Sequence, residues 1–152
     1  MRPRTSDSHL FHTRDDLVSD GWELNGNVFE RGKKRMLPLY EAKMIHHYDD
    51  RWATYERDGS VRDVTVDEKR DPNFVVMPRY WVDQNEVVAK RGNWGRDWLL
   101  GWRRIARSTD ERTLICAVVS EVAMGDSIFL MLPSAVSDPA DGSAGGRRAQ
   151  AD

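Results

Sequence analysis

The stretch WELNGNVF, residues 22–29, decides the fold class. Asn25 and Gly26 form a dipeptide that readily takes the positive φ angles of a tight hairpin turn, and apolar residues stand on both sides of it. The stretch therefore predicts a β-hairpin, in which neighbouring strands run antiparallel.

A short helix is expected just before this hairpin. Thr13 and Asp16 have the spacing of a helix N-cap followed by an acidic first turn, and Gly21 would end the helix after two turns. These signals predict a helix from Arg14 to Asp20. Further along, Pro38 interrupts the apolar run of residues 36–40, which favours an edge strand or an irregular extended segment because proline lacks an N–H.

Extended segments dominate the rest of the chain. Asp58 and Gly59 separate two of them, which predicts a second hairpin. The expected strand-like segments are residues 52–57, 61–66, 74–77, 79–82, 114–119 and 127–132. Trp94, Trp98 and Trp102 recur every four residues, but nearby glycines weaken a long helix, so a short helix passing into a strand at 102–106 is expected.

Together these patterns predict one α+β domain, made mainly of antiparallel strands with a few short helices. Residues 1–9 are polar and without periodicity, so they are expected to be a flexible lead-in. Residues 10–133 would form the folded region. Residues 134–152 are rich in Ser, Ala, Gly, Asp and Pro and carry almost no large apolar side chain, which predicts a disordered tail.

Composition narrows the possible functions. The 152 residues carry 23 Lys and Arg against 25 Asp and Glu, a formal charge of -2, so the whole molecule lacks the basic excess of a general nucleic-acid binder. No apolar run approaches the roughly 18 residues of a membrane span, and no secretory signal is visible, so a cytoplasmic protein without membrane contact is expected. Cys116 is the only cysteine, which excludes an internal disulfide and a zinc site of paired cysteines.

One segment is locally basic. Residues 90–107 read KRGNWGRDWLLGWRRIAR, with six positive side chains against the single acid Asp97. Arginines interleaved with tryptophans suit phosphate contacts beside an apolar wall. The alternative is that the tryptophans fill the core while the arginines are solvated or paired with acids.

Motifs for catalysis are sparse. The sequence holds no glycine loop of the P-loop or dinucleotide type and no Gly-x-Ser-x-Gly elbow. His46 and His47 are adjacent, and in a strand their rings would point to opposite faces, which disfavours a shared metal. The acids and lysine that could superficially form a metal-dependent nuclease site are Asp49, Asp50, Asp63, Glu68 and Lys69.

Four stretches together resemble one protein family. They read LFHTRDDL followed by GW and GNVF (10–29), LPLYEAKMIHHYDDRWATY (37–55), DPNFVVMPRYWV (71–82) and DWLLGWRRIARSTDERTLICAVV (97–119). Their order and spacing resemble the adenine-specific DNA methyltransferases of combined restriction-modification enzymes and related phage-defence methylases. In that family the corresponding region runs from the end of the catalytic domain into the target-recognition domain, which holds DNA and selects the methylated sequence.

The sequence also departs from that family. It lacks the Asn-Pro-Pro-Tyr or Asn-Pro-Pro-Phe motif that binds a flipped adenine and the glycine loop that binds S-adenosylmethionine, the cofactor of the parent family. Asp50 replaces the histidine expected after the Tyr-Asp pair, and the family normally continues with further recognition-domain sequence beyond Pro133. We therefore expect a noncatalytic DNA-recognition fragment of such a methyltransferase, from a truncated or frame-shifted gene, which holds no cofactor of its own.

The resemblance and the basic segment name eight candidate DNA contacts. They are Lys43, His46, Tyr48, Arg51, Arg103, Arg104, Arg107 and Arg112. For several of these residues a structural role is the alternative: Lys43 could pair with Glu41, Tyr48 could belong to the core, and Arg112 could cap or pair with a neighbouring acid. The expected partners are duplex DNA and a separate methyltransferase catalytic chain. The alternative functions are a remnant that only docks on such a chain, and the metal-dependent nuclease.

Overall fold

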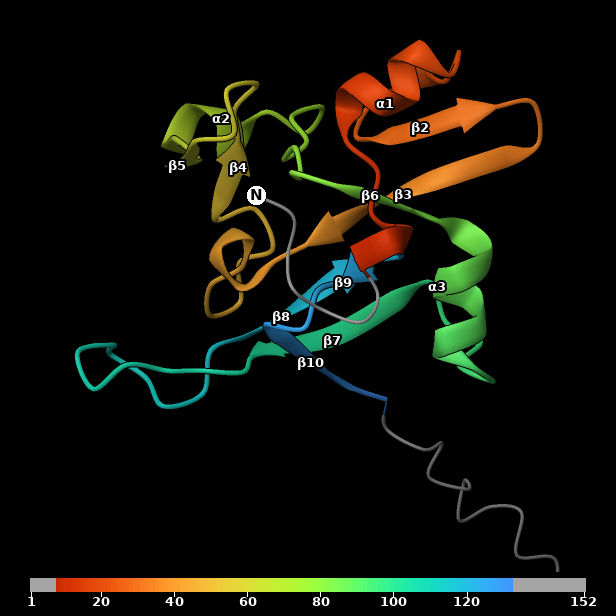
Figure 1. The fold of residues 1–152 in the computed structure, drawn as a ribbon. Helices are drawn as coiled ribbons and strands as arrows, with labels where there is room; N and C mark the ends of the chain where they lie inside the picture. Colours follow the sequence, from red (N-terminus) through yellow and green to blue (C-terminus); the bar gives the residue numbers. More distant parts are fainter. Residues whose placement is uncertain (1–7, 133–152) are drawn as a thin grey trace, which may run out of the picture.

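The computed structural model describes residues 8–132, which form an α+β fold of small, mainly antiparallel sheets with a few short helices, as the sequence predicts (Figure 1). The predicted tail 134–152 lies outside the described residues. So does the predicted lead-in, residues 1–9, except that Ser8 and His9 belong to a 3-10 helix, η1 (Ser8–Leu10). No helix within the described range is long and apolar enough to cross a membrane.

The first sheet grows from the predicted hairpin. Strand β1 (Glu23–Asn25) pairs with β2 (Val28–Arg31) across a turn in which Gly26 has a φ of 61°, so the hairpin prediction is confirmed. The preceding helix α1 (Arg14–Ser19) is also confirmed, since the Thr13 side chain and Asp16 form a reciprocal capping box. The hairpin continues into β3 (Lys34–Tyr40), and β3 pairs on its other side with β6 (Trp81–Asp83).

The prediction that residues 36–40 form an edge or irregular segment is wrong, because β3 is a central strand. Pairing with β2 ends at Met36, and parallel pairing with β9 (Ala123–Met124) begins at Leu39. Pro38 lies in the gap between these two partners and pairs only with β6. Its missing N–H therefore removes no ladder hydrogen bond on the β2 and β9 side.

The second sheet has the order β10-β7-β8, with β7 (Trp98–Arg103), β8 (Cys116–Ser120) and β10 (Ile128–Met131) all antiparallel. The predicted short helix before residue 102 is wrong, because β7 already begins at Trp98. Leu99 and Gly101 are buried and alternate with half-buried neighbours, so the period is that of a strand. The helix of this region lies earlier, at α3 (Gln84–Arg91), capped by the Asp83 carboxylate.

A small hairpin, β4 (Ala53–Tyr55) and β5 (Val61–Asp63), forms a third sheet. This confirms the hairpin predicted around Gly59, but the strand ends at Asp63 because Thr65 caps the helix α2 (Val66–Arg70). Of the two strand-like segments predicted next, residues 74–77 are irregular and the second gives β6. The 3-10 helix η2 (Ala42–Met44) joins β3 to this region.

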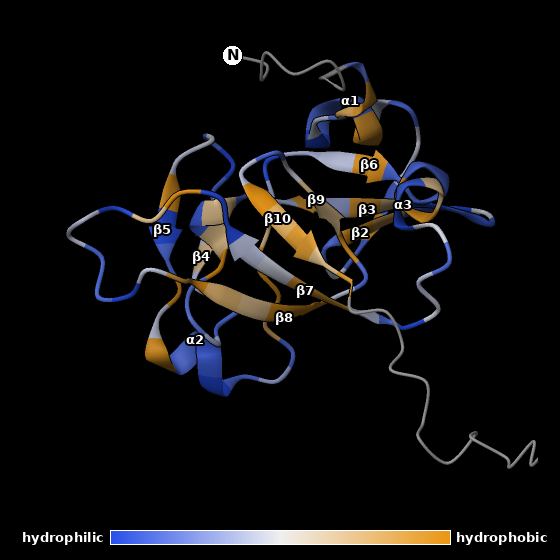
Figure 2. Ribbon diagram, turned by 90° about the horizontal axis from the view of Figure 1, so that it is seen from below, coloured by the Kyte–Doolittle hydropathy of each residue, from blue (hydrophilic) through white to orange (hydrophobic). Residues whose placement is uncertain are grey.

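Three buried clusters form the core, and the smallest lies around Leu39 and Val82. A second cluster lies between α1 and the first sheet, around Phe29 and Trp81, whose rings meet edge to face with centroids 5.0 Å apart. The largest cluster joins η2 and the β4–β5 hairpin to the inward face of the second sheet, around Ile45 and Leu99. Apolar strands of the second sheet face the viewer in Figure 2 without a helix over them.

Candidate nucleic-acid interface

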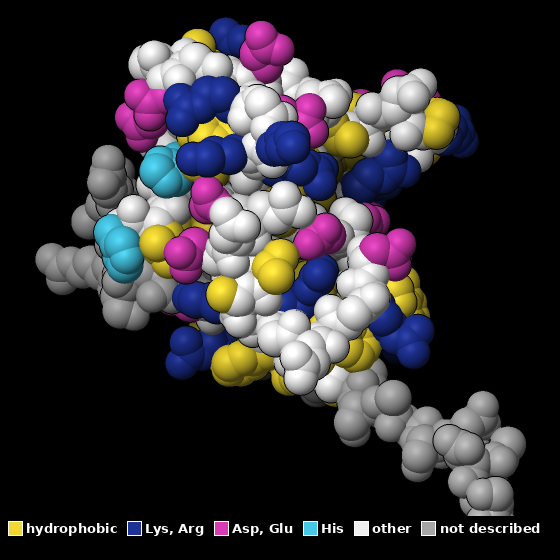
Figure 3. All heavy atoms as spheres, turned by 90° about the vertical axis from the view of Figure 1, so that its right-hand side faces the viewer, with side chains coloured by type: hydrophobic (Ala, Val, Ile, Leu, Met, Phe, Trp, Pro, Cys, Tyr) yellow, Lys and Arg dark blue, Asp and Glu magenta, His cyan; other side chains and the backbone are white. Residues whose placement is uncertain are grey.

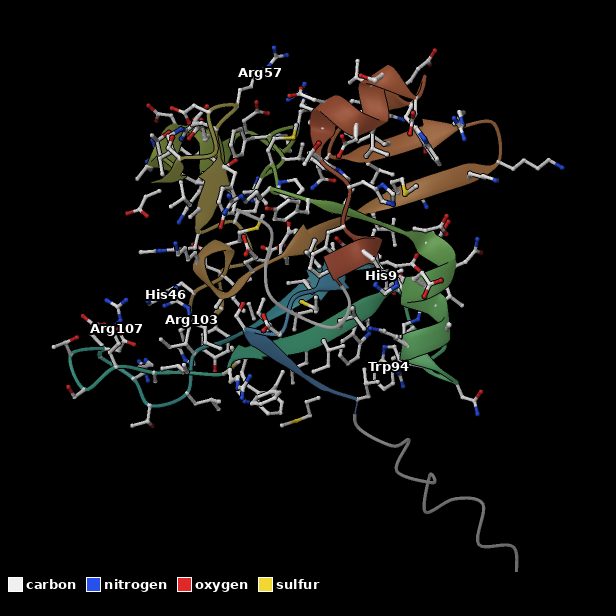
Figure 4. All side chains as sticks on the ribbon, in the orientation of Figure 1. His9, His46, Arg57, Trp94, Arg103 and Arg107 are labelled. Carbon is white, nitrogen blue, oxygen red and sulfur yellow. The ribbon has the colours of Figure 1, made fainter. Side chains whose placement is uncertain are left out.

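Several predicted contacts meet in one groove at the end of β7. The groove has a volume of about 670 Å³ and lies between η2, the β4–β5 hairpin and the loop that follows β7. We call it the basic groove, and its charged and aromatic lining consists of Lys43, Trp52, Arg62, Asp63, Arg103, Arg107 and Asp110. Figure 4 shows Arg103 and Arg107 on this side of the molecule, with His46 beside them.

Arg103 joins the groove to the core. Its Nε and Nη2 atoms donate hydrogen bonds of 3.1 and 2.7 Å to the carbonyl oxygen of Ile45. Burial lowers the pKa of Arg103 from its ordinary value, and the nearby Asp110 opposes that shift. Arginine still keeps its charge at neutral pH, because its unperturbed pKa is far above 7. Arg103 therefore brings a fixed positive charge to the floor of the groove.

Lys43 and Arg107 are exposed at the rim of the groove. The Glu41 carboxylate, considered as a partner of Lys43, accepts a hydrogen bond from the Tyr55 hydroxyl. The backbone N–H of Arg107 donates to Asp110 at 2.7 Å, which fixes the start of the loop. The two rim side chains come from segments that are far apart in the sequence.

Arg62 lines the groove but its charge is already matched. Its guanidinium contacts Glu56 at 2.5 Å and Glu68 at 2.7 Å. The hydrogen bonds from Arg62 lower the pKa of Glu68 to about 2, and the pKa of Arg62 is raised in turn. Arg62 was not predicted from the sequence, because a lone arginine in a short strand carries no signal of its position.

Two further candidates flank the groove in a structural role. The His46 ring stacks on Trp52 with centroids 4.4 Å apart. Trp52 lines the groove, and no sequence signal predicts that position. Arg51 donates to the carbonyl oxygens of Lys69, Asp71 and Phe74 at 2.7 to 3.2 Å. Its guanidinium therefore fastens the segment after α2 to the rest of the fold.

Tyr48 lies between His46 and Arg51 in the sequence, but its side chain is outside the core. Its side chain is 85% exposed, so the alternative of a core tyrosine is wrong. Arg104 and Arg112 are also exposed and do not line the groove. The Arg104 guanidinium lies 5.7 Å from the centre of the Phe129 ring, on the second sheet.

The basic segment 90–107 does not form one surface. Strand β7 separates its two ends, and Figure 4 shows Trp94 far from Arg103 and Arg107. At the Trp94 end, the Trp94 and Trp98 rings meet edge to face and the Arg96 guanidinium lies over both, at 5.8 and 5.7 Å. Only the C-terminal end of the segment, which carries Arg103 and Arg107, reaches the basic groove.

Three of the five residues considered for a nuclease, Asp49, Glu68 and Lys69, are engaged in ion pairs. Lys69 forms a 2.5 Å ion pair with Asp49, and Glu68 is held by Arg62. Among residues 8–132, no group of three or more His, Cys, Asp or Glu side chains could hold a metal ion.

Five glycines of the described residues have a positive φ. These glycines stand at helix ends and hairpin turns, as Gly21, Gly26, Gly32, Gly59 and Gly92. A cofactor loop would instead need glycines where a strand runs into a helix.

Comparisons with protein-family models, with curated proteins and with solved structures give no match to this chain.

Proposed function

We propose that this protein is a noncatalytic DNA-recognition module of the adenine-methyltransferase type and that duplex DNA lies across the basic groove. The observation that supports this proposal is the meeting of Lys43, Arg103 and Arg107 in one groove. These three residues come from two of the stretches that carry the family resemblance. Methyl transfer would belong to a separate catalytic chain, and both would act in the cytoplasm.

The distribution of charged side chains favours this groove over the rest of the surface as the place where DNA binds. Apart from Arg62, which is paired with Glu56 and Glu68, three cations and two carboxylates line it, although the whole chain carries a formal charge of -2. On the side of the molecule that carries the β2–β3 turn and α3, basic and acidic side chains lie next to one another (Figure 3). Phosphate binding depends on such local cation density, because counterions leave the DNA where it is neutralised.

The test is a titration of duplex DNA with a charge-removing pair, Lys43→Gln with Arg107→Gln. The matched control is Lys33→Gln with Lys34→Gln in the β2–β3 turn, which removes two exposed charges on the opposite side of Figure 1. Each lost phosphate contact should lower the slope of log K against log salt by about one unit. Fluorescence anisotropy at about 50 and 200 mM salt measures that slope.

We expect the groove pair to bind more weakly and to lose about two units of slope, while the turn pair behaves like the wild type. Equal loss in both pairs would mean that only total charge matters, and the groove would not be the DNA surface. A second readout is methyl transfer from S-adenosylmethionine to adenine, which the chain alone should not perform.

A second candidate function is docking on a separate methyltransferase catalytic chain, which the outer face of the second sheet favours. Val118, Phe129 and Met131 are 58%, 46% and 46% exposed, and their cross-strand partners are Leu100 and Trp102. Exposed contiguous apolar side chains of this kind mark interaction sites. Val118→Lys should abolish capture of a chain that carries the Asn-Pro-Pro-Tyr motif, identified by mass spectrometry, without loss of DNA affinity.

A further inference from the structure

Tyr48 combines two features that no other described residue shares. Its side chain is 85% exposed, more than any other large apolar or aromatic side chain between residues 8 and 132. Its backbone φ is 59°, and within that range it is the only residue other than glycine with a positive φ. Left-handed backbone is unfavourable for a bulky residue, and an exposed ring gains nothing from burial. The fold therefore holds an aromatic ring out into solvent.

The turn around Tyr48 shows how the ring is held. His46 and Asp49 exchange backbone hydrogen bonds of 2.7 and 3.0 Å, so His47 and Tyr48 are the two central residues of a tight turn. A turn with positive φ at its second central position ordinarily has Gly or Asn there. The Tyr48 N–H also donates to the Cys116 carbonyl oxygen at 2.8 Å, which ties the turn to the start of β8.

Both sides of the turn are fastened. The His46 ring stacks on Trp52, and Asp49 forms its ion pair with Lys69 while also accepting from the Arg51 N–H at 2.9 Å. The half-buried His47 ring lies beside the Tyr48 ring, with the two ring centres 4.1 Å apart. The aromatic ring is thus presented on a rigid support, which reduces the entropy lost when it meets a ligand.

The turn adjoins the basic groove. Ile45, the residue just before it, holds Arg103 through its carbonyl oxygen, and the Trp52 ring under His46 lines the groove. We propose that the Tyr48 ring stacks on an unstacked nucleobase of the DNA that the groove binds. This inference rests on the proposed function. Base stacking on an exposed aromatic beside a basic channel is sequence-tolerant and independent of phosphate contacts.

The chain offers a matched pair of variants that separates the ring from the backbone. Tyr48→Phe keeps the ring and the unfavourable φ, whereas Tyr48→Asn removes the ring but suits the left-handed backbone. Thermal unfolding should show the Asn variant at least as stable as the wild type. Any loss of binding in that variant then comes from the missing ring rather than from a damaged fold.

The probes are two DNA duplexes, one fully paired and one with a single bulged 2-aminopurine. The wild type and Tyr48→Phe should bind the bulged duplex more tightly and quench its fluorescence. Tyr48→Asn should bind it about 5- to 150-fold more weakly, the range expected for one lost base stack, without quenching. The salt slope should stay the same in all three proteins, because no phosphate contact changes.

The outcomes separate the two proposals. If the wild type binds neither duplex, the DNA-recognition function fails, and the stacking role fails with it. If DNA binds with the expected salt slope but Tyr48→Asn quenches and binds like the wild type, the stacking role alone is overturned. Loss of binding in Tyr48→Phe equal to that in Tyr48→Asn would overturn it as well, since a hydroxyl contact rather than the ring would then be responsible.

Discussion

The two larger sheets place their tryptophans differently. In the region of the first sheet, Trp22 and Trp81 are 6% and 2% exposed. In the second sheet, Trp98 and Trp102 stay half-buried on the outward face. The first sheet is covered by α1 on one face and by Leu10, Phe11 and Val87 on the other, whereas among residues 8–132 no helix lies over the outward face of the second sheet.

An aromatic residue on one of these sheets becomes core or surface depending on whether another element covers the face on which it lies. Trp81 and Trp102 look alike in the sequence, since each stands in a short apolar run beside arginines. One is core and the other is surface because α1 lies over Trp81, while no described helix lies over the outward face that carries Trp102.

Replacing the two tryptophans should give the largest contrast. Trp81→Ala loses a buried ring, its contact with Phe29 and the 2.7 Å hydrogen bond from its Nε1–H to the Asn27 carbonyl, so it should lower the free energy of unfolding by about 3–5 kcal/mol. Trp102→Ala should cost about 1 kcal/mol, because its ring is half-exposed. Urea unfolding measures both, and similar losses would mean that the outer face of the second sheet is covered.

Two neighbouring arginines, Arg103 and Arg104, should likewise differ in how much they contribute to stability. Arg103→Ala leaves the Ile45 carbonyl without its donors, so it should cost about 1.5–3 kcal/mol, as expected for a hydrogen bond to a charged group. Arg104→Ala is the matched control on the exposed side and should change stability by less than about 0.5 kcal/mol. A loss in Arg104→Ala as large as in Arg103→Ala would contradict the separation of inner and outer faces.

Gly101 tests how tightly the inward face of the second sheet is packed. A Cβ atom there would lie 2.9 Å from Cγ2 of Ile128 and 3.3 Å from Cε of Met124. Gly101→Ala should cost about 1–2 kcal/mol, because the two side chains must shift and the gain in chain stiffness offsets only part of that cost. Gly95→Ala has open space around it and serves as the control in the same melting experiment.

The smallest effect should come from the β4–β5 hairpin, which belongs to neither sheet. Arg62 lowers the pKa of Glu68 to about 2, below its ordinary value of 4.5. The carboxylate therefore contributes stability above about pH 4.5 and loses that contribution as the pH falls towards 2. The difference in melting temperature between the wild type and Glu68→Gln should shrink over this range, and a difference that stayed constant would refute the pair.

The sequence could predict the parts of the fold that local chemistry determines. Asn25 and Gly26 predicted the first hairpin, and Thr13 with Asp16 predicted α1, because turns and caps are made by neighbouring residues. The central position of β3 could not be found, since it depends on β6 and β9 arriving on its two sides. The strand character of β7 was missed for a related reason: its tryptophan spacing suits a helix, and only cross-strand partners reveal the strand.

The sequence could likewise predict only some of the residues of the candidate site. Lys43, Arg103 and Arg107 were predicted as DNA contacts from the sequence, and all three line the groove. Arg51 was predicted with them, yet its guanidinium is bound to backbone carbonyls. A guanidinium donates equally well to a phosphate or to a carbonyl oxygen, so residue type alone cannot tell these roles apart.

The parallel pairing of β3 with β9 sets the order in which this chain can fold. Leu39 pairs with Ala123, about half the chain length later, while the hairpins of the first sheet need only neighbouring residues. Contacts between such distant residues slow folding, because a long loop must close before they form. During synthesis the β1–β2–β3 unit would emerge early, with one edge of β3 waiting for residues made near the end. That interval leaves an unpaired strand edge open to association with other nascent chains.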